Sequence, residues 1–262
     1  MGINLNNFIS KYLSRLKIKS EPKPYLSFLK ELHRKHLLNI PFENLNIHYG
    51  FKIETSKPAL EKKILDQNRG GFCYELNGAF SFLLKEIGFD ISLLSARVIN
   101  ENGELGAEFD HLVLFVKLEE GNFLVDVGFG EAFLEPLKFE LGKTQTQLGR
   151  AFKIIKVEEN QFKLLKSDDS KTFSEKYLFS LTTRQLSDFE GMCKFHQTSP
   201  DSVFTNKVIC TKATSTGRIT LSDSKFIETI NGIKTETEVQ NEIEFKKLLK
   251  QKFEIEINLN VS

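Results

Sequence analysis

Three residue types that cooperate in nucleophilic catalysis occur in order along the chain, and the first is a cysteine. Cys73 follows Gly70 and Gly71 in the stretch RGGFCYELNGAF, where the glycines let the backbone turn into a predicted helix. A cysteine at the first turn of a helix lies near unpaired N–H groups and the positive end of the helix dipole, and both favour the thiolate. We therefore interpret Cys73 as a candidate nucleophile, whereas a thiol buried elsewhere would only pack.

A histidine and an aspartate each interrupt an apolar run further along. His111 begins HLVLFVKL, and Asp126 lies within FLVDVGFG. A buried carboxylate is costly unless it is paired, so Asp126 needs a partner. The two side chains share one face of the predicted hairpin if its loop has an even number of residues. They meet only if the turn centres near Leu118 or Glu119, whereas a tight turn at residues 120–121 places them too far apart to touch. The sequence leaves the register open.

Contact between these residues would give each one a role. Asp126 would accept a hydrogen bond from one imidazole nitrogen of His111 and fix its tautomer, and the other nitrogen would take the proton of Cys73. In the alternative interpretation, His111 and Asp126 form a structural polar pair and Cys73 is a buried thiol. The glycine pair and the two interrupted apolar strands favour catalysis.

The elements that must position these residues fall into three parts. Residues 1–88 show mainly helical spacing and carry Cys73. Residues 89–180 contain short β-branched or aromatic runs that are typical of an antiparallel sheet curling into a barrel, and they carry His111 and Asp126. Residues 181–262 mix strand and helix patterns. The sequence therefore predicts an α+β fold with an N-terminal helical bundle, a central antiparallel β-barrel and a C-terminal α/β lid.

Composition excludes several classes of partner. The chain has 262 residues and a formal net charge of +1, so no basic field would attract nucleic acid or an acidic membrane. Cys73, Cys193 and Cys210 form an odd set without framework spacing, which favours a reducing compartment. No signal peptide and no apolar run long enough to cross a bilayer is evident. We expect a cytoplasmic protein.

The remaining histidines suggest no metal site. His33 and His36 share a predicted helical face, but no third ligand is evident, and their setting in ELHRKHLLNIPF fits a solvated or capping role. His196 stands three residues after Cys193 without obvious partners. We assign no metal.

Four segments in order resemble the arylamine N-acetyltransferase family: IPFENL (40–45), RGGFCYELN (69–77), HLVLFV (111–116) and LVDVGFG (124–130). The order of cysteine, histidine and aspartate agrees with that family's triad, and the three-part layout extends the likeness over nearly the whole chain. The resemblance implies a cysteine-protease-like catalytic core and a ping-pong reaction. Acetyl-CoA would acylate the cysteine, coenzyme A would leave, and an arylamine or hydrazine would take the acetyl group.

The resemblance also implies a role for individual residues near the reacting group. Cys73 is then the acetyl-accepting nucleophile, His111 its base and Asp126 the orienting acid. The backbone N–H of Cys73 or Tyr74 is a candidate donor to the oxyanion. Arg69 would hold the catalytic loop to Glu43 of the IPFEN segment, a structural role.

The resemblance points to further residues that contact the two substrates. Phe42 and Phe129 are candidates for the acceptor pocket, with core packing as the equal alternative. Gly128 and Gly130 would permit close approach of the acetyl group or the pantetheine arm. Thr214 matches a family position that contacts coenzyme A. Its neighbours Thr216 and Gly217 would contribute, although Ser/Thr-Gly runs are commonly plain turns.

Two other functions remain open on the residues alone. A cysteine protease or a transglutaminase-like acyltransferase uses the same Cys-His-Asp order and an acyl-cysteine, so the triad does not separate these enzymes. A catalytically silent binding module is disfavoured, because it has no need to keep a carboxylate within an apolar strand. The IPFEN and RGG segments favour acetyl transfer, and the physiological acceptor is left open.

Overall fold

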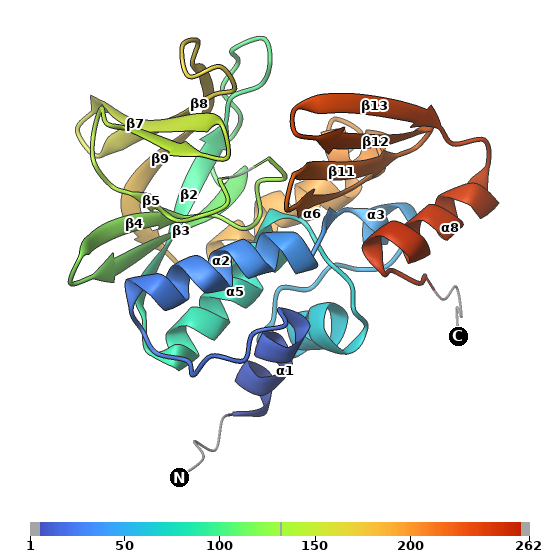
Figure 1. The fold of residues 1–262 in the computed structure, drawn as a ribbon, viewed down its shortest axis with the longest axis horizontal. Helices are drawn as coiled ribbons and strands as arrows, with labels where there is room; N and C mark the ends of the chain where they lie inside the picture. The colour runs from blue at the N-terminus through green and yellow to red at the C-terminus, as the bar shows by residue number, and fades with distance from the viewer. Residues whose placement is uncertain (1–5, 132, 258–262) are drawn as a thin grey trace.

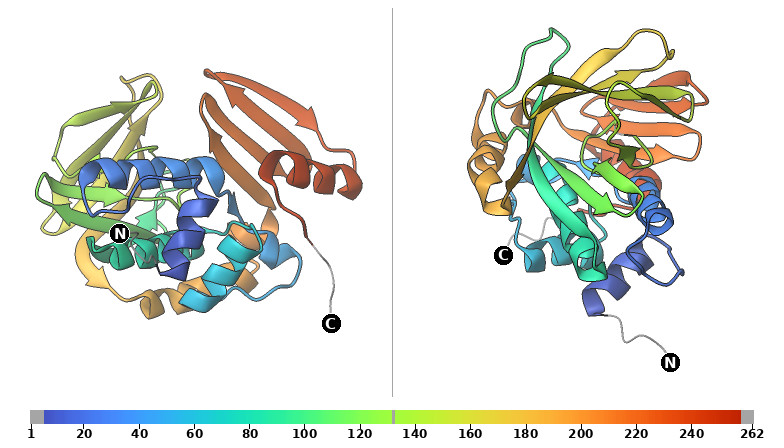
Figure 2. Two further views of the ribbon diagram at one scale, coloured as in Figure 1. Left: turned by 60° about the horizontal axis from the view of Figure 1, so that its bottom comes forward. Right: turned by 90° about the vertical axis from the view of Figure 1, so that its left-hand side faces the viewer.

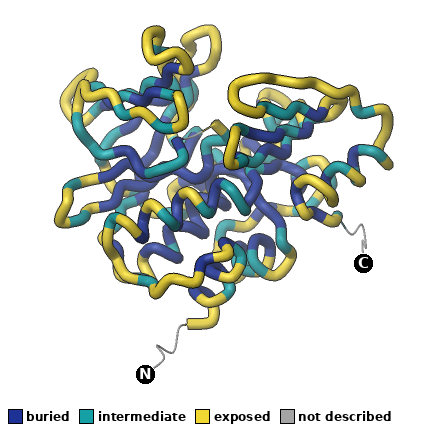
Figure 3. The backbone as a smooth tube through the Cα atoms, viewed as in Figure 1, coloured by how far each residue is buried: buried dark blue, intermediate teal, exposed yellow. Residues whose placement is uncertain are grey.

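The computed structural model of the protein describes residues 6–131 and 133–257. A helical layer carries an antiparallel barrel and a second, smaller sheet, which lie side by side above it in Figure 1 and in the left view of Figure 2. Buried backbone concentrates where the three parts meet, and the hairpin tips are exposed (Figure 3). This arrangement confirms the predicted α+β fold.

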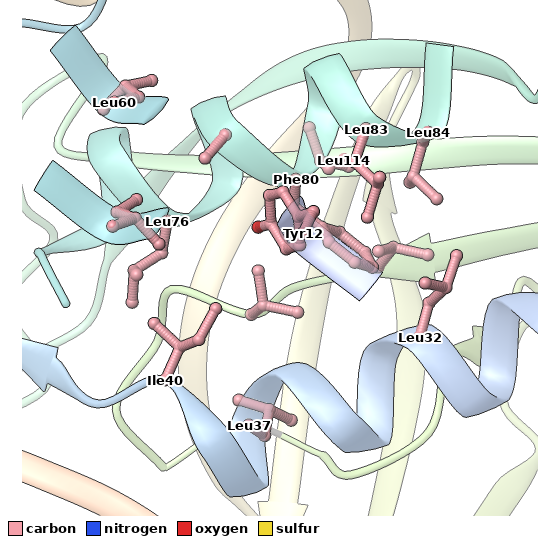
Figure 4. Packing of buried hydrophobic residues seen from close by; sticks show 14 of the residues in the cluster. Tyr12, Leu32, Leu37, Ile40, Leu60, Leu76, Phe80, Leu83, Leu84 and Leu114 are labelled. Carbon is pink, nitrogen blue, oxygen red and sulfur yellow. The ribbon is translucent and has the colours of Figure 1, made fainter. Parts of the chain in front are cut away.

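The N-terminal part is helical and centres on α5, which is buried along most of its length. Helix α5 begins at Cys73 and ends at Ile87, and the following Gly88 has a φ of 102°, the left-handed conformation that commonly closes a helix. Leu32 and Leu37 of α2 pack with Phe80 of α5 in one apolar cluster (Figure 4). Each such side chain contributes about 1.5–3 kcal/mol on burial. The helices are α1 Asn7–Arg15, α2 Leu26–Asn39, α3 Leu45–His48, α4 Lys57–Leu60, a π-helical turn Glu61–Asp66 and α5 Cys73–Ile87.

The middle part is an eight-stranded antiparallel sheet in the order β5-β4-β3-β2-β9-β8-β7-β6. Helix α5 packs against β3, which is buried from His111 to Val116. This contact brings the helix that begins with the cysteine to the strand that begins with the histidine. The strands are β2 Asp90–Val98, β3 His111–Leu118, β4 Gly121–Val125, β5 Leu137–Lys138, β6 Thr144–Gln147, β7 Arg150–Glu158, β8 Gln161–Ser167 and β9 Ser174–Arg184.

The two outer strands of this sheet meet through side chains rather than through a backbone ladder. The amide of Gln145 accepts from the N–H of Lys138 and donates to its carbonyl oxygen, both at 2.8 Å. Gln147 makes the same pair of hydrogen bonds with the backbone of Glu135, at 2.9 and 2.8 Å. The glutamines of β6 thus complete a nearly closed barrel, as the strand pattern predicted.

The second sheet has the order β1-β10-β11-β12-β13 and takes its first strand from the IPFEN segment. Phe42 pairs with Thr211, and Glu43 pairs with Cys210. The predicted three-part division stays a prediction, and its boundary at residue 180 falls within β9. The elements are β1 Phe42–Glu43, a 3₁₀ turn Leu186–Phe189, α6 Glu190–Thr198, α7 Val203–Asn206, β10 Ile209–Thr214, β11 Gly217–Ser222, β12 Lys225–Ile230, β13 Ile233–Glu238 and α8 Glu242–Phe253.

Candidate active site

Cys73 is the first residue of α5 and is only 3% exposed. Burial raises the pKa of the Cys73 thiol well above its usual value, and a backbone hydrogen bond with Leu112 acts in the opposite direction. Desolvation of this buried sulfur therefore opposes the thiolate that the helix terminus favours. A thiolate at this position needs a nearby group that takes up the proton.

His111 and Asp126 are in direct contact, with 2.8 Å between Nε2 and Oδ2. The β3–β4 turn is Glu119–Glu120, because Leu118 pairs with Gly121. The loop therefore has an even number of residues. When the β3–β4 register is extended by one residue, however, Asp126 lies opposite Val113 rather than opposite His111. Strand β4 ends at Val125, so Asp126 lies just beyond the strand. Its side chain reaches His111, which is two residues before Val113 on β3. The observed register is neither of the two that the sequence analysis considered.

Asn77 links the cysteine helix to this pair and was missed by the sequence analysis. Its Nδ2 donates to Asp126 Oδ1 at 2.9 Å and to the Leu112 carbonyl oxygen at 2.6 Å, and its Oδ1 accepts from Val127 N–H at 2.9 Å. Asn77 lies four residues after Cys73, so both project from one face of α5. A polar residue within the apolar run of this helix was the available signal.

The hydrogen bonds around Asp126 favour its ionised form and fix which nitrogen of His111 carries a hydrogen toward it. Burial alone would raise the pKa of Asp126, but hydrogen bonds and charge interactions with His111, Asn77 and Gly128 more than offset it, and the pKa lies below the usual value. An ionised carboxylate only accepts hydrogen bonds, so His111 Nε2 carries a hydrogen. Nδ1 is then the nitrogen available to take up a proton.

Four buried charges hold the start of α5 from another direction. Arg69 donates twice to Glu43 Oε1, at 3.0 and 2.8 Å. Lys63 Nζ lies 2.6 Å from Glu75 Oε1 and 3.7 Å from Glu43 Oε1. Glu75 Oε2 also accepts from the N–H of Phe72, directly before the cysteine. Lys63 and Glu75 were not singled out in the sequence. We name this set, Arg69, Glu43, Lys63 and Glu75, the ion cluster.

One cavity of about 430 Å³ brings several of the candidate residues together, although Asp126 does not line it. Cys73 and His111 both line it, and Phe42 and Phe129 lie on its walls with Phe204. The Phe129 ring meets the His111 ring edge-on, with centroids 5.1 Å apart. We call this space the catalytic cavity.

Gly128 and Gly130 also line the catalytic cavity, and the two positions differ in how much room a side chain would find. A Cβ on Gly128 would lie 2.8 Å from Cys73 Cα, so only glycine lets the chain after Asp126 approach the cysteine this closely. Gly130 has a φ of +47°, and a Cβ there would find room beside Thr211.

A second cavity of about 680 Å³ lies between the barrel and the second sheet, and we call it the large cavity. Thr216 and Gly217 of the β10–β11 hairpin line it, and Thr214 pairs with Gly217 beside it. A Cβ on Gly217 would lie 2.0 Å from the Thr229 carbonyl oxygen, so this glycine also permits close pairing with β12. Glu131 lines both cavities, which are therefore neighbours.

The large cavity is lined by three cationic side chains, Arg150, Lys166 and Arg218, of which Lys166 and Arg218 are buried. The exposed fraction of Arg218 is 9%, and burial lowers the pKa of its guanidinium to about 10. Nη1 donates to Thr211 Oγ1 at 2.9 Å, and among the described residues Nε has no hydrogen-bond partner. Lys166 pairs with Glu131 at 2.8 Å, and Arg150 with Asp168 at 3.3 Å.

The other histidines differ from expectation. His33 and His36 are fully buried, so the solvated or capping role is wrong. Their helical face packs into the interior against α5, which the local sequence does not reveal. His196 has partners after all: Ser202 Oγ at 3.0 Å and Asp110 Oδ1 at 3.1 Å. Within residues 6–131 and 133–257, no three His, Cys, Asp or Glu side chains are grouped to hold a metal.

Fold and site together define the class, a cysteine-protease-like core in which a helix that begins with cysteine packs against a sheet carrying a histidine and an acid. A family model described as N-acetyltransferase matches residues 25–261. An arylamine N-acetyltransferase pineal gland isozyme of Gallus gallus is 34% identical over 95% of this chain and 94% of its own length. The chain belongs to the arylamine N-acetyltransferase family.

Solved structures agree with this assignment. An arylamine N-acetyltransferase from Bacillus cereus with a Cys-His-Glu catalytic triad has a TM-score of 0.89 and 28% identity, over 97% of this chain and all of the other. The enzyme from Mycobacterium marinum in complex with CoA has a TM-score of 0.87 and 27% identity, over 94% of this chain and 92% of the other.

No helix in the described part of the chain is both long enough and apolar enough to span a bilayer.

Proposed function

We propose that this protein transfers an acetyl group from acetyl-CoA to the nitrogen of an arylamine or arylhydrazine through an acetyl-Cys73 intermediate. The observation that carries the proposal is the shared cavity of Cys73 and His111, with Asp126 held 2.8 Å behind the histidine. The catalytic triad of the Bacillus cereus relative and the CoA complex of the Mycobacterium marinum relative support it.

In the first half-reaction, the Cys73 sulfur attacks the thioester carbonyl and its proton passes to His111 Nδ1. A new S–C bond forms, the bond to the coenzyme A sulfur breaks, and the protonated imidazole returns the proton to that sulfur. Because burial disfavours a lone thiolate, the proton transfer creates an ion pair that Asp126 stabilises. Exchange of one thioester for another is nearly balanced in energy. The backbone N–H of Cys73 or Tyr74 is the proposed donor to the oxyanion.

In the second half-reaction, the amine nitrogen attacks the acetyl carbonyl and Cys73 is the leaving group. A weakly basic aromatic amine is neutral at pH 7, so it attacks without prior deprotonation, and His111 takes the proton released as the amide forms. Phe42, Phe129 and Phe204 give the cavity apolar walls that suit a flat aromatic ring. Arylhydrazines present the same ring and a similar nucleophile.

We place the phosphate-bearing end of acetyl-CoA in the large cavity, which adjoins the catalytic cavity at Glu131. Arg218 offers a buried guanidinium that no carboxylate within 4.0 Å neutralises among the described residues, and guanidinium geometry suits phosphate. Thr214, Thr216 and Gly217 form the neighbouring hairpin. Replacing Arg218 with Ala should raise KM for acetyl-CoA by about tenfold, the loss of one charge-assisted hydrogen bond. Lys156→Ala, at an exposed position of β7, is the control.

Acyl transfer is tested by intact-mass measurement. Incubation with acetyl-CoA alone should add one acetyl group to the protein, and later addition of an aromatic amine should remove it with one equivalent of acetylated amine. An unmodified wild-type protein would reject the mechanism. Peptide cleavage without an acetyl adduct would instead indicate a cysteine protease.

The compartment is part of the same proposal. Cys73, Cys193 and Cys210 are all buried free thiols. This supports a reducing compartment, and we propose the cytoplasm.

A further inference from the structure

A single buried imidazole joins the two ends of the chain segment that separates the cavities. His33 lies on α2 and is fully buried. Its Nε2 accepts the backbone N–H of Asp126 at 3.2 Å, and its Nδ1 donates to the carbonyl oxygen of Leu134 at 3.0 Å. The ring also stacks on Phe133, with centroids 5.4 Å apart and planes 8° from parallel. One side chain therefore fixes both where this segment begins and where it ends.

The segment between these two hydrogen bonds contributes lining residues to both the catalytic cavity and the large cavity. Gly128, Phe129 and Glu131 line the catalytic cavity, while Glu131, Phe133 and Leu134 line the large cavity. We call residues 126–134 the wall segment; residue 132 lies outside the described residues. Its first residue is also the carboxylate that contacts His111. Any shift of this segment would change the acid behind the histidine and the shape of both cavities.

Only one form of the imidazole satisfies both bonds. Nε2 must lack a hydrogen to accept from Asp126, and Nδ1 must carry one to donate to Leu134. Burial lowers the pKa of His33 to about 4, so the ring is neutral at physiological pH. The neutral ring has a donor and an acceptor on opposite sides, as the two ends of the wall segment require.

We propose that His33 is a positioning residue for the reaction, which holds Asp126 in place for acylation and holds the wall segment in the shape that receives the acceptor. The inference rests on the proposed acetyl transfer. Packing alone would be served by an apolar side chain at the same place, whereas His33 meets two backbone groups with a directional bond each. Leaving either backbone group unpaired in the interior carries a penalty.

His36 provides a matched control from the next turn of α2. It is also fully buried, and burial likewise lowers its pKa well below the usual value. Its Nδ1 bonds the hydroxyl of Tyr12 at 3.1 Å, on α1 and away from the wall segment. A substitution at His36 therefore disturbs the same helix without touching Asp126 or Leu134.

Two substitutions at His33 separate the ends of the wall segment. In His33→Asn the amide nitrogen stands near the position of Nδ1 and can still donate to Leu134, but Asp126 N–H loses its acceptor. In His33→Gln the amide oxygen stands near Nε2 and can still accept from Asp126, but the Leu134 carbonyl loses its donor. We expect His33→Asn to slow acylation by acetyl-CoA about tenfold, the loss of one buried hydrogen bond. We expect His33→Gln to acylate at nearly the wild-type rate and to raise KM for the aromatic amine several-fold.

Hydrogen–deuterium exchange tests the clamp without any need for activity. Peptides covering residues 126–134 should exchange faster in both His33 variants than in wild type, and His36→Gln should leave them unchanged. Equal exchange in wild type and the His33 variants would overturn the proposal, as would a common loss of activity in His33→Asn, His33→Gln and His36→Gln with no split between acylation rate and amine KM. A wild-type protein that forms no acetyl adduct would reject the proposed function, while the exchange measurement would still decide whether His33 holds the wall segment.

Discussion

Two buried polar groups meet the N-terminal end of α5, and they differ in what surrounds them. The ion cluster consists of four full charges that pair with one another, and none of its members lines the catalytic or the large cavity. His111, Asp126 and Asn77 are equally buried, but His111 also lines the catalytic cavity with Cys73. Burial of charge is common to both groups. Contact of the His111 side chain with a cavity distinguishes them.

This contrast teaches what each group contributes. The ion cluster has every charge opposed at close range, so its members stabilise the backbone before Cys73 and have no group left for a substrate. The His111 group is complete on the Asp126 side and open on the other. Substitutions in the first group should therefore act on stability, and substitutions in the second on rate.

The largest effect should come from the nucleophile itself. Replacing Cys73 with Ser removes the thiol that carries the acetyl group, because a serine hydroxyl beside the same imidazole is a far weaker nucleophile. No acetyl adduct should be seen by intact mass after incubation with acetyl-CoA. Cys193→Ser, which also removes a buried free thiol, should acylate normally. Adduct formation in Cys73→Ser would place the acetyl group on another residue.

The next largest effect tests the contact between Asp126 and His111 while keeping a side chain of the same size at position 126. In Asp126→Asn the side chain keeps its size but no longer holds His111 in the tautomer that accepts the thiol proton, so acylation should slow by about 10³–10⁴-fold. Labelling of Cys73 by iodoacetamide should slow as well, while the melting temperature stays close to that of wild type. An undiminished acylation rate would show that Asp126 is structural, and the contrast between the two groups would fail.

The ion cluster should show the opposite pattern. Arg69→Ala leaves Glu43 buried with Lys63 as its remaining cation, and the loss of one partner from a buried pair costs about 3–5 kcal/mol of unfolding free energy. Arg69→Lys keeps the charge but not the two-fold hydrogen bond to Glu43, so it should fall between Ala and wild type. Chemical denaturation measures both variants. A wild-type midpoint for Arg69→Ala would contradict the stabilising role.

The smallest effect is a dependence of stability on pH that arises from His33. Its folded pKa of about 4 lies below the usual 6.5, so as pH falls through this range the unfolded chain binds a proton that the folded protein does not. The free energy of unfolding should therefore decrease from pH 6.5 towards pH 4, by about 3 kcal/mol for this group. In His33→Gln the decrease should be smaller by that amount. A slope unchanged by the substitution would mean that His33 does not titrate in this range.

Local patterns in the sequence were sufficient to predict much of this molecule. Strand and helix periodicities gave the α+β fold, and the apolar runs around His111 and Asp126 indicated that both would be buried. Asn77 and Lys63 escaped notice because their partners are set by how α5 meets β3 and the π-helical turn. The contact of His33 with Asp126 joins residues 93 positions apart, and nothing within ELHRKHLLN reveals it. The diagonal register of His111 and Asp126 depended on where β4 ends, which the apolar run does not mark.

The contact of β6 with the backbone of Glu135 and Lys138, which closes the barrel, affects how the protein behaves in solution. A sheet edge normally displays a row of free amide and carbonyl groups, to which a strand from another molecule can add. Gln145 and Gln147 occupy those groups on Lys138 and Glu135, so the barrel offers no template at this point. Two side-chain amides thus protect this part of the barrel from edge-to-edge association, a task that most open sheets leave to charged or kinked outer strands.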